Sequence, residues 1–229
     1  MKLIFVRHGH PDYQKDCLTD LGKKQAEKAA ESLLTAGIEQ IYASTHGRAQ
    51  ETASYTANQL GLPILPCEFM REIAWRPLDP ENEAGLANPW NTAAADVLAG
   101  RSLLDPHWRN RAPYCLSEVV GRVDTVISGF DAFLAQLGYQ REGDYYRVTR
   151  TNTDRTLAIF SHAGSASAAI AHMLNIPLPH FCGLLQFDFT SITTLNLANE
   201  LGALVYPKLI CANDARHTAD ITEENVFGF

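Results

Sequence analysis

Residues able to bind or attack an anionic group follow a short apolar run at the start of the chain. Residues 3–6 are apolar, and Arg7 and His8 come directly after them, followed by a glycine. A short apolar run is typical of a buried strand, and ligands of α/β proteins gather beyond the carboxyl ends of such strands. Arginine suits phosphate or carboxylate, and histidine can act as nucleophile, proton carrier or metal ligand. The sequence therefore predicts a site of chemistry at Arg7 and His8.

Two further predicted strands also end in polar residues. The run at 41–44 ends in Ser44 and is followed by Arg48, and the run at 156–161 leads into His162. If these strands are parallel neighbours of the first, two arginines and two histidines meet at one edge of the sheet. The helices that follow would add N-terminal N–H groups and partial positive charge. We expect this edge to form a pocket for a tetrahedral dianion.

The elements that must position these residues alternate between strands and helices. Hydrophobic patterns and turn residues predict strands at 2–7, 41–44, 63–67 and 156–161, helices at 20–36, 47–60, 116–137 and from 164 onward, a hairpin within 139–149, and late strands within 186–197 and 204–210. Thr19 is placed to cap the first helix. The β-α-β-α-β order favours a parallel sheet covered by helices.

One stretch, residues 76–115, interrupts this alternation. It contains five prolines and is too aromatic for a disordered linker, so we expect an inserted cap subdomain within a single domain spanning residues 1–229. The aromatic side chains in or beside it either line a substrate site or form the cap's own core, and they are Trp75, Trp90, Trp108 and Tyr114.

Charge and cysteine content limit the partners and the compartment. The net charge of −7 argues against general nucleic-acid binding. The five cysteines are scattered, odd in number and without a Cys-x-x-Cys pair, which is typical of reduced thiols in a cytosolic protein. The N-terminal apolar run is too short for a signal peptide, and no run could span a membrane. We expect a cytoplasmic protein without a membrane partner, and a homodimer remains one option for its oligomeric state.

Several segments together resemble the histidine phosphatase superfamily, which includes the cofactor-dependent phosphoglycerate mutases. They are Arg7-His8-Gly9 after its strand, LTDLGKKQA at 18–26, YASTHGRAQETA at 42–53, REI at 71–73 and FSHAG at 160–164. Their order and spacing are similar to those of the family, and the resemblance covers about residues 1–75 and 155–175.

The resemblance implies a three-layer α/β/α sandwich with a mostly parallel sheet, and a phosphatase that forms a phosphohistidine on His8. Arg7, Arg48 and His162 would then surround the phosphoryl group and stabilise its charge. Glu72 would protonate the leaving oxygen and then take a proton from water. With positive charge already in place, such a site needs no metal and no cofactor. The expected substrate is a small phosphorylated metabolite selected by the cap.

The chain departs from the family pattern after its first motif. The family commonly has an acidic or amide residue, then Thr or Ser, then Asn three residues later, and this chain has His10, Pro11 and Gln14 there. Gln14 is retained as a candidate phosphate-binding residue. These differences do not match the mutase pattern, so we expect a phosphatase and not a phosphoglycerate-type mutase.

The proton donor also lies in an altered segment. The family's Gly-x-Trp-Glu-Gly run after the acid is missing, and residues 75–79 (WRPLD) take its place. Glu68, Asp79 and Glu81 are therefore alternatives to Glu72 as the proton donor.

Two other functions compete with the phosphatase. His8, His10 and Asp12 give an H-x-H-x-D spacing after a strand, which some metal-dependent hydrolases use. Against a metal, Arg7 would lie beside a dication, and Arg48 would have no role. The second alternative is a catalytically weak phosphate-binding module that keeps the pocket without turnover.

Overall fold

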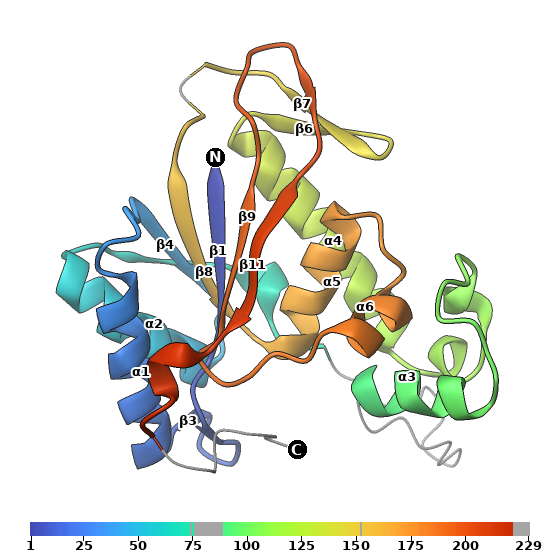
Figure 1. The fold of residues 1–229 in the computed structure, drawn as a ribbon, viewed down its shortest axis with the longest axis horizontal. Coiled ribbons are helices and arrows are strands. Elements are labelled where there is room, and N and C mark those ends of the chain that lie inside the picture. The colour runs from blue at the N-terminus through green and yellow to red at the C-terminus, as the bar shows by residue number, and fades with distance from the viewer. Residues whose placement is uncertain (74, 76–88, 152, 222–229) are drawn as a thin grey trace.

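The fold is organised around one six-stranded sheet. The computed structural model describes residues 1–73, 75, 89–151 and 153–221 (Figure 1). The strands of this sheet, in spatial order, are β11 (Lys208–Asp214), β9 (Ile192–Asn196), β1 (Lys2–Arg7), β8 (Thr156–Ser161), β4 (Gln40–Ala43) and β5 (Ile64–Pro66). β1, β8, β4 and β5 pair in parallel, whereas β9 and β11 are antiparallel. The predicted mostly parallel sheet is therefore confirmed.

Smaller strands and the helices complete the described chain. A three-stranded antiparallel sheet holds β10 (Leu204–Val205), β7 (Tyr145–Val148) and β6 (Tyr139–Glu142), and a two-stranded ribbon holds β2 (Pro11–Asp12) and β3 (Cys17–Leu18). The α-helices are α1 (Asp20–Leu33), α2 (Gly47–Leu60), α3 (Pro89–Leu98), α4 (Val119–Gln136), α5 (Ala163–Met173) and α6 (Leu178–Leu184). Short 3-10 helices lie at η1 (Glu68–Met70), η2 (Trp108–Asn110), η3 (Tyr114–Leu116) and η4 (Arg216–Thr218).

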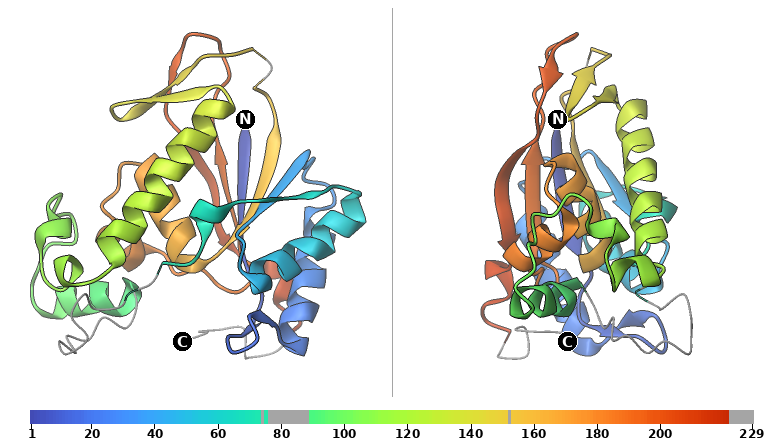
Figure 2. Two further views of the ribbon diagram at one scale, coloured as in Figure 1. Left: turned by 180° about the vertical axis from the view of Figure 1, so that it is seen from behind. Right: turned by 90° about the vertical axis from the view of Figure 1, so that its right-hand side faces the viewer.

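Helices cover both faces of the central sheet. Helices α1 and α2 pack together, and α2 contacts β4 and β8 on one face. On the other face α5 contacts β1, and α4 and α6 pack against α5. The two views in Figure 2 show these layers from behind and from the side. The chain is thus the α/β/α sandwich that the resemblance implied.

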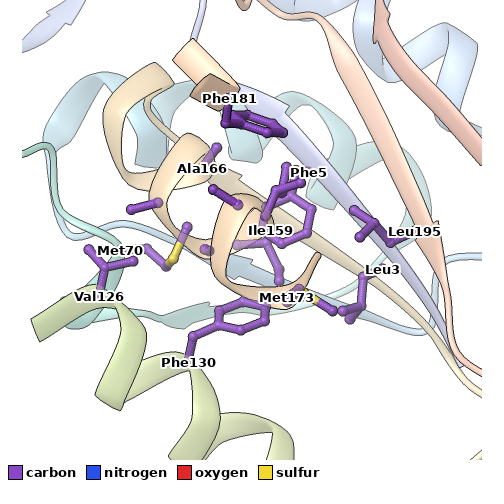
Figure 3. Close-up of a cluster of buried hydrophobic side chains, with 14 of the residues drawn as sticks. Leu3, Phe5, Met70, Val126, Phe130, Ile159, Ala166, Met173, Phe181 and Leu195 are labelled. Atoms are coloured by element: carbon purple, nitrogen blue, oxygen red, sulfur yellow. The ribbon is translucent and has the colours of Figure 1, made fainter. Parts of the chain in front are cut away.

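Strict alternation along β1 sends its side chains to two separate cores. Leu3 and Phe5 belong to the larger buried cluster beneath α4 and α5, part of which Figure 3 shows. Ile4 and Val6 belong to the cluster beneath α1 and α2. Because successive side chains of a strand point to opposite faces, a strand covered on both sides must be apolar throughout. This burial fixes where β1 ends and therefore where Arg7 lies.

Most of the predicted helix boundaries agree with the structure. Thr19 caps α1, since its hydroxyl oxygen accepts a hydrogen bond from the Gly22 N–H at 3.1 Å. Helix α1 ends at Leu33, slightly before the expected residue 36. Helix α2 begins at Gly47 and ends before Gly61, whose φ of 67° suits a left-handed cap.

The predicted cap is described only in part, because residues 76–88 lie outside the described residues. Its remaining part forms α3, η2 and η3, and α3 packs against α6. Trp108 and Tyr114 are buried in the larger core cluster with ring centroids 5.1 Å apart, and half-buried Trp75 packs against Tyr114. Trp108 and Tyr114 are therefore core residues, whereas Trp75 packs at the edge of the core. The side chain of Trp90 lies outside the described part.

The late strand predicted within 186–197 is shorter than expected. Only Ile192–Asn196 forms β9. The preceding residues leave the strand path, and the carbonyl oxygen of Phe187 accepts a hydrogen bond from Arg7 instead. The predicted strand is therefore confirmed at residues 192–196 and does not extend to residues 186–191.

Two sequence expectations concern the whole chain. In the part of the chain that the structure describes, no helix combines the length and apolar character needed to cross a membrane. All five cysteines are free thiols.

Candidate active site

The three strand ends that carry polar residues are neighbours in the sheet. β8 lies between β1 and β4, and Arg7 pairs with Ser161 at the end of the parallel ladder. His8 follows β1, and His162 lies between β8 and α5. Arg48 is the second residue of α2, the helix that follows β4. The sheet order thus brings both arginines and both histidines to one edge, as expected.

His8 is held as a neutral ring with one unprotonated nitrogen. Its Nδ1 lies 2.7 Å from the carbonyl oxygen of Gly9, which can only accept, so Nδ1 carries the proton. Arg48 donates from Nε to His8 Nε2 over 3.3 Å. Burial, and then Arg7 and Arg48, hold the pKa of His8 well below its ordinary value. His8 Nε2 therefore has the electron pair that a nucleophile needs.

His162 lies beside His8 as a second buried imidazole ring. Its ring centroid lies 5.1 Å from that of His8, and burial, then His8 and Arg48, hold its pKa well below its ordinary value. His162 Nε2 lies 2.8 Å from the hydroxyl of Ser44. A neutral ring that accepts from Ser44 at Nε2 carries its proton on Nδ1. That buried atom has no hydrogen-bond partner among the described residues.

One nitrogen of the Arg7 guanidinium is hydrogen-bonded, and another has no described partner. Its Nη1 donates to the carbonyl oxygen of Phe187 at 2.5 Å, and its guanidinium carbon lies 3.9 Å from the centre of the Phe189 ring. The Nε of this buried arginine has no partner within the described residues. Buried donors are nearly always bonded. Arg7 Nε and, in that tautomer, His162 Nδ1 are therefore buried donors available to a further partner.

Glu72 lies at the N-terminus of α5, on the same edge of the sheet. Its Oε1 accepts hydrogen bonds from the backbone N–H groups of Ile73, at 2.9 Å, and Ser165, at 3.2 Å. A Cβ at position 164 would lie 2.5 Å from that oxygen, so the site requires Gly164. Burial raises the pKa of Glu72 despite these bonds and the nearby arginines. A raised pKa suits a group that donates and then accepts a proton.

The alternative proton donors have less suitable surroundings. Glu68 is exposed, accepts a hydrogen bond from Thr45 and pairs with Arg71 at 3.1 Å. These bonds lower the pKa of Glu68, which keeps it ionised. Asp79 and Glu81 lie outside the described residues.

The structure does not bring Gln14 into the pocket. Its side chain is exposed, and its backbone N–H donates to Asp12. Asp16, two residues later, instead reaches Arg48 with an Oδ1–Nη1 distance of 2.5 Å. Sequence reasoning missed Asp16, and the only local signal was Gly47, a residue that allows close backbone approach directly before Arg48.

His10 and Asp12 do not converge with His8. His10 Nδ1 lies 2.9 Å from the hydroxyl of Thr19. Asp12 accepts hydrogen bonds from the backbone N–H groups of Gln14 and Lys15. Among the described residues, no three His, Cys, Asp or Glu side chains are grouped so that they could hold a metal ion. In the H-x-H-x-D segment, His10 and Asp12 thus bond neighbouring loop and helix-cap groups and do not join His8 in a metal site.

Among curated proteins, the chain is 34% identical over 117 residues to the mitochondrial serine/threonine-protein phosphatase Pgam5 of Drosophila yakuba. This match covers 47% of the chain and 39% of that protein, so the chain spans well under half the length of this relative.

Solved structures resemble the chain over most of its length. A mycobacterial glucosyl-3-phosphoglycerate phosphatase is 26% identical with a TM-score of 0.63, covering 93% of this chain and 98% of that one. It has also been solved with VO3 and with inorganic phosphate. A phosphoserine phosphatase of Entamoeba histolytica, solved with 3-phosphoglyceric acid, is 20% identical with a TM-score of 0.62, covering 94% and 98%. The model of the histidine phosphatase superfamily (branch 1) matches residues 3–208, and the chain belongs to this family.

Proposed function

We propose that this chain hydrolyses phosphomonoesters of small metabolites through a phosphohistidine on His8. One observation carries the proposal. The unprotonated Nε2 of His8 faces Arg48 Nε at 3.3 Å, and the two buried donors without described partners, Arg7 Nε and His162 Nδ1, belong to the same cluster. Fixed donors around a nucleophile stabilise the charge that develops on a transferring phosphoryl group.

The first transfer forms a bond between His8 Nε2 and phosphorus and breaks the bond between phosphorus and the leaving oxygen. The protonated Glu72 carboxyl gives its proton to that oxygen, so the product leaves as an alcohol. Nδ1 keeps its proton and its hydrogen bond to Gly9 throughout, which holds the ring in place.

The second transfer uses the same groups in reverse. The Glu72 carboxylate takes a proton from water while the water oxygen bonds to phosphorus. The bond between phosphorus and Nε2 breaks, and its electron pair returns to His8. Inorganic phosphate is released, and both residues regain their starting protonation.

Hydrolysis of p-nitrophenyl phosphate tests the proposal directly. We expect His8→Ala to lower kcat by at least about a thousandfold, whereas His107→Ala, at an exposed histidine, should leave it unchanged. Brief incubation with labelled substrate should give an acid-labile phosphoryl group on the wild-type protein only. Turnover that survives His8→Ala would overturn the proposal.

Two further measurements separate the competing functions. Vanadate should inhibit without any metal requirement, whereas loss of activity with a chelator would favour the metal-dependent hydrolase. A protein that binds phosphate but turns nothing over would be the catalytically weak binding module. Release of free phosphate, without phosphoryl transfer to a second substrate position, distinguishes a phosphatase from a mutase.

The remaining parts of the proposal concern substrate selection, cellular location and oligomeric state. We propose that the inserted segment at 76–115 acts as the cap that selects the leaving group. The free cysteines support the reducing cytoplasm as the location. The homodimer stays a prediction, which analytical ultracentrifugation can check.

A further inference from the structure

We propose that Asp16 is a positioning residue that holds one edge of the Arg48 guanidinium so that its Nε edge faces the phosphoryl group on His8. This inference rests on the proposed phosphatase function. Asp16 makes no hydrogen bond to His8 in the described structure; its side chain bonds Arg48, and it acts through that arginine.

The Asp16 carboxylate is bonded from three directions by the start of α2. Oδ1 lies 2.5 Å from Arg48 Nη1. Oδ2 accepts a hydrogen bond from the Gly47 N–H at 2.7 Å and lies 3.3 Å from His46 Nδ1. Both oxygens of one carboxylate are thus fixed, and charge-assisted bonds of this kind are strong and directional.

The backbone around Asp16 is built to allow these contacts. Asp16 has a φ of 50°, in the left-handed region that most residues avoid and that Asp and Asn tolerate best among side chains with a Cβ. A Cβ at position 47 would lie 2.2 Å from the Asp16 carbonyl oxygen, so only glycine fits there. The left-handed backbone at Asp16 and the glycine at position 47 thus both allow the Asp16 carboxylate to reach the start of α2.

Asp16 and His8 use different edges of one arginine. Nη1 of Arg48 is bonded to Asp16, and Nε points to His8 Nε2. The guanidinium is planar and rigid, so fixing one edge also fixes the direction of the other. Arg48 is almost fully buried, and without Asp16 its charge would lack a described acidic partner and its Nε would lose its fixed direction.

A comparison with Glu72 separates the roles of the two carboxylates. Each binds a helix N-terminus, Asp16 at Gly47 of α2 and Glu72 at Ser165 of α5. Burial alone would raise the pKa of Asp16, but bonds from Gly47 and Arg48 hold it below its ordinary value. The pKa of Glu72 is raised by burial. Two carboxylates whose pKa values are shifted in opposite directions can take different roles, and Asp16 is the one that stays ionised.

We expect Asp16 to affect the rate of turnover but not the affinity for phosphate. A carboxylate beside the pocket gains nothing from a bound dianion, because the two negative charges repel. An ordered Arg48 gives its largest benefit in the transition state, where charge on the phosphoryl oxygens is redistributed. Removing the Asp16 charge should therefore lower kcat while leaving phosphate affinity nearly unchanged.

The test compares two carboxylates of the same loop. In Asp16→Asn we expect kcat to fall about tenfold or more, with the dissociation constant of inorganic phosphate within about twofold of wild type. Asp12→Asn is the matched control, since Asp12 bonds only loop groups in the described structure. Asp16→Gly, which suits the positive φ, should reproduce the kcat loss without a folding defect.

A double-mutant cycle shows whether Asp16 acts through Arg48. In an Arg48→Ala background, Asp16→Asn should cause no further loss of kcat. Wild-type kcat in Asp16→Asn, an equal loss in both backgrounds, or a matching loss of phosphate affinity would each overturn the inference. If His8→Ala is inactive and Asp16→Asn is fully active, only this inference fails, whereas activity in His8→Ala removes the proposed function itself.

Discussion

Arg48 Nε lies 3.3 Å from His8 Nε2 and donates to the electron pair that attacks phosphorus in the proposed reaction. In the free protein this bond orients the His8 ring, which burial and the charges of Arg7 and Arg48 keep neutral. Once Nε2 bonds to phosphorus it can no longer accept a hydrogen bond, and Arg48 Nε is released to the phosphoryl oxygens. The same donor therefore has a stronger partner in the transition state than in the ground state, which is the condition for catalysis by differential binding.

Replacing Arg48 by lysine tests this exchange of partners. Lysine keeps the charge but lacks the fork that spans Asp16 and His8. We expect Arg48→Lys to lower kcat for p-nitrophenyl phosphate by about a hundredfold and to weaken vanadate inhibition in parallel. Arg71→Lys is the control, because Arg71 is exposed and pairs with Glu68. Equal effects of the two substitutions would contradict the role given to Arg48.

Substrates with different leaving groups test whether Glu72 is the proton donor. An alkyl phosphate needs its leaving oxygen protonated, whereas p-nitrophenolate leaves readily as an anion. We expect Glu72→Gln to lower kcat/KM for an alkyl phosphate by about 10²–10⁴-fold and to affect p-nitrophenyl phosphate far less. The amide also removes the base for the second step, so a phosphoryl label on His8 should persist longer in the variant. Equal losses with both substrates would contradict the acid role.

The pH dependence follows from the same two groups. In the proposed reaction His8 must be neutral, and its pKa lies well below the ordinary 6.5, so mild acid does not protonate it. Glu72 must be protonated, and its pKa is raised above 4.5, so activity is lost as pH rises through that raised value. We expect kcat/KM for an alkyl phosphate to fall on the alkaline side, and this fall should be absent in Glu72→Gln. A wild-type alkaline limb in the variant would assign it to another group.

Glycine at position 164 offers a structural test of the Glu72 carboxylate. A Cβ there would lie 2.5 Å from Glu72 Oε1, so Gly164→Ala should displace the carboxylate and lower turnover of alkyl phosphates. Gly121→Ala in α4 is the matched control, because a Cβ there meets nothing within 4 Å. We expect that control to keep full activity and gain about 1 kcal/mol of stability. Wild-type activity in Gly164→Ala would show that the acid lies elsewhere.

Much of the site could be predicted because strand periodicity determines the positions of its main residues. Apolar residues along β1 and β8 require cover on both faces, so the polar residues that follow these apolar runs, Arg7 for β1 and Ser161 and His162 for β8, must lie at or just beyond the strand ends. The parallel order of β1, β8 and β4 then brings these ends together. Sequence alone indicated this order only through the alternation of strands and helices and through the family resemblance.

Other parts of the site depend on contacts that leave no periodic pattern. Gln14 and Asp16 lie in the same short loop, and it is Asp16, with its positive φ, whose side chain bonds Arg48. The carbonyl oxygen of Phe187 reaches Arg7 from 180 residues away along the chain. Both contacts are tertiary, so neither composition nor spacing could have predicted them.

The two buried histidines predict how stability depends on pH. His8 and His162 are almost fully buried, and both pKa values lie well below 6.5 in the folded protein. As pH falls below about 6.5, the unfolded chain binds protons that the folded protein does not, so stability decreases. The expected loss is at most about 1.4 kcal/mol per pH unit for each histidine, with full stability retained above pH 6.5.

Denaturant melts between pH 8 and pH 5 measure this slope. The double variant His8→Asn/His162→Asn should lose the histidine part of it, while His107→Asn, at an exposed position, should keep the wild-type slope. If the double variant keeps the wild-type slope, the folded histidines take up protons as readily as unfolded ones do. Nε2 of His8 would then be protonated in mild acid and unable to attack phosphorus. This equilibrium measurement therefore tests the nucleophile without depending on any substrate.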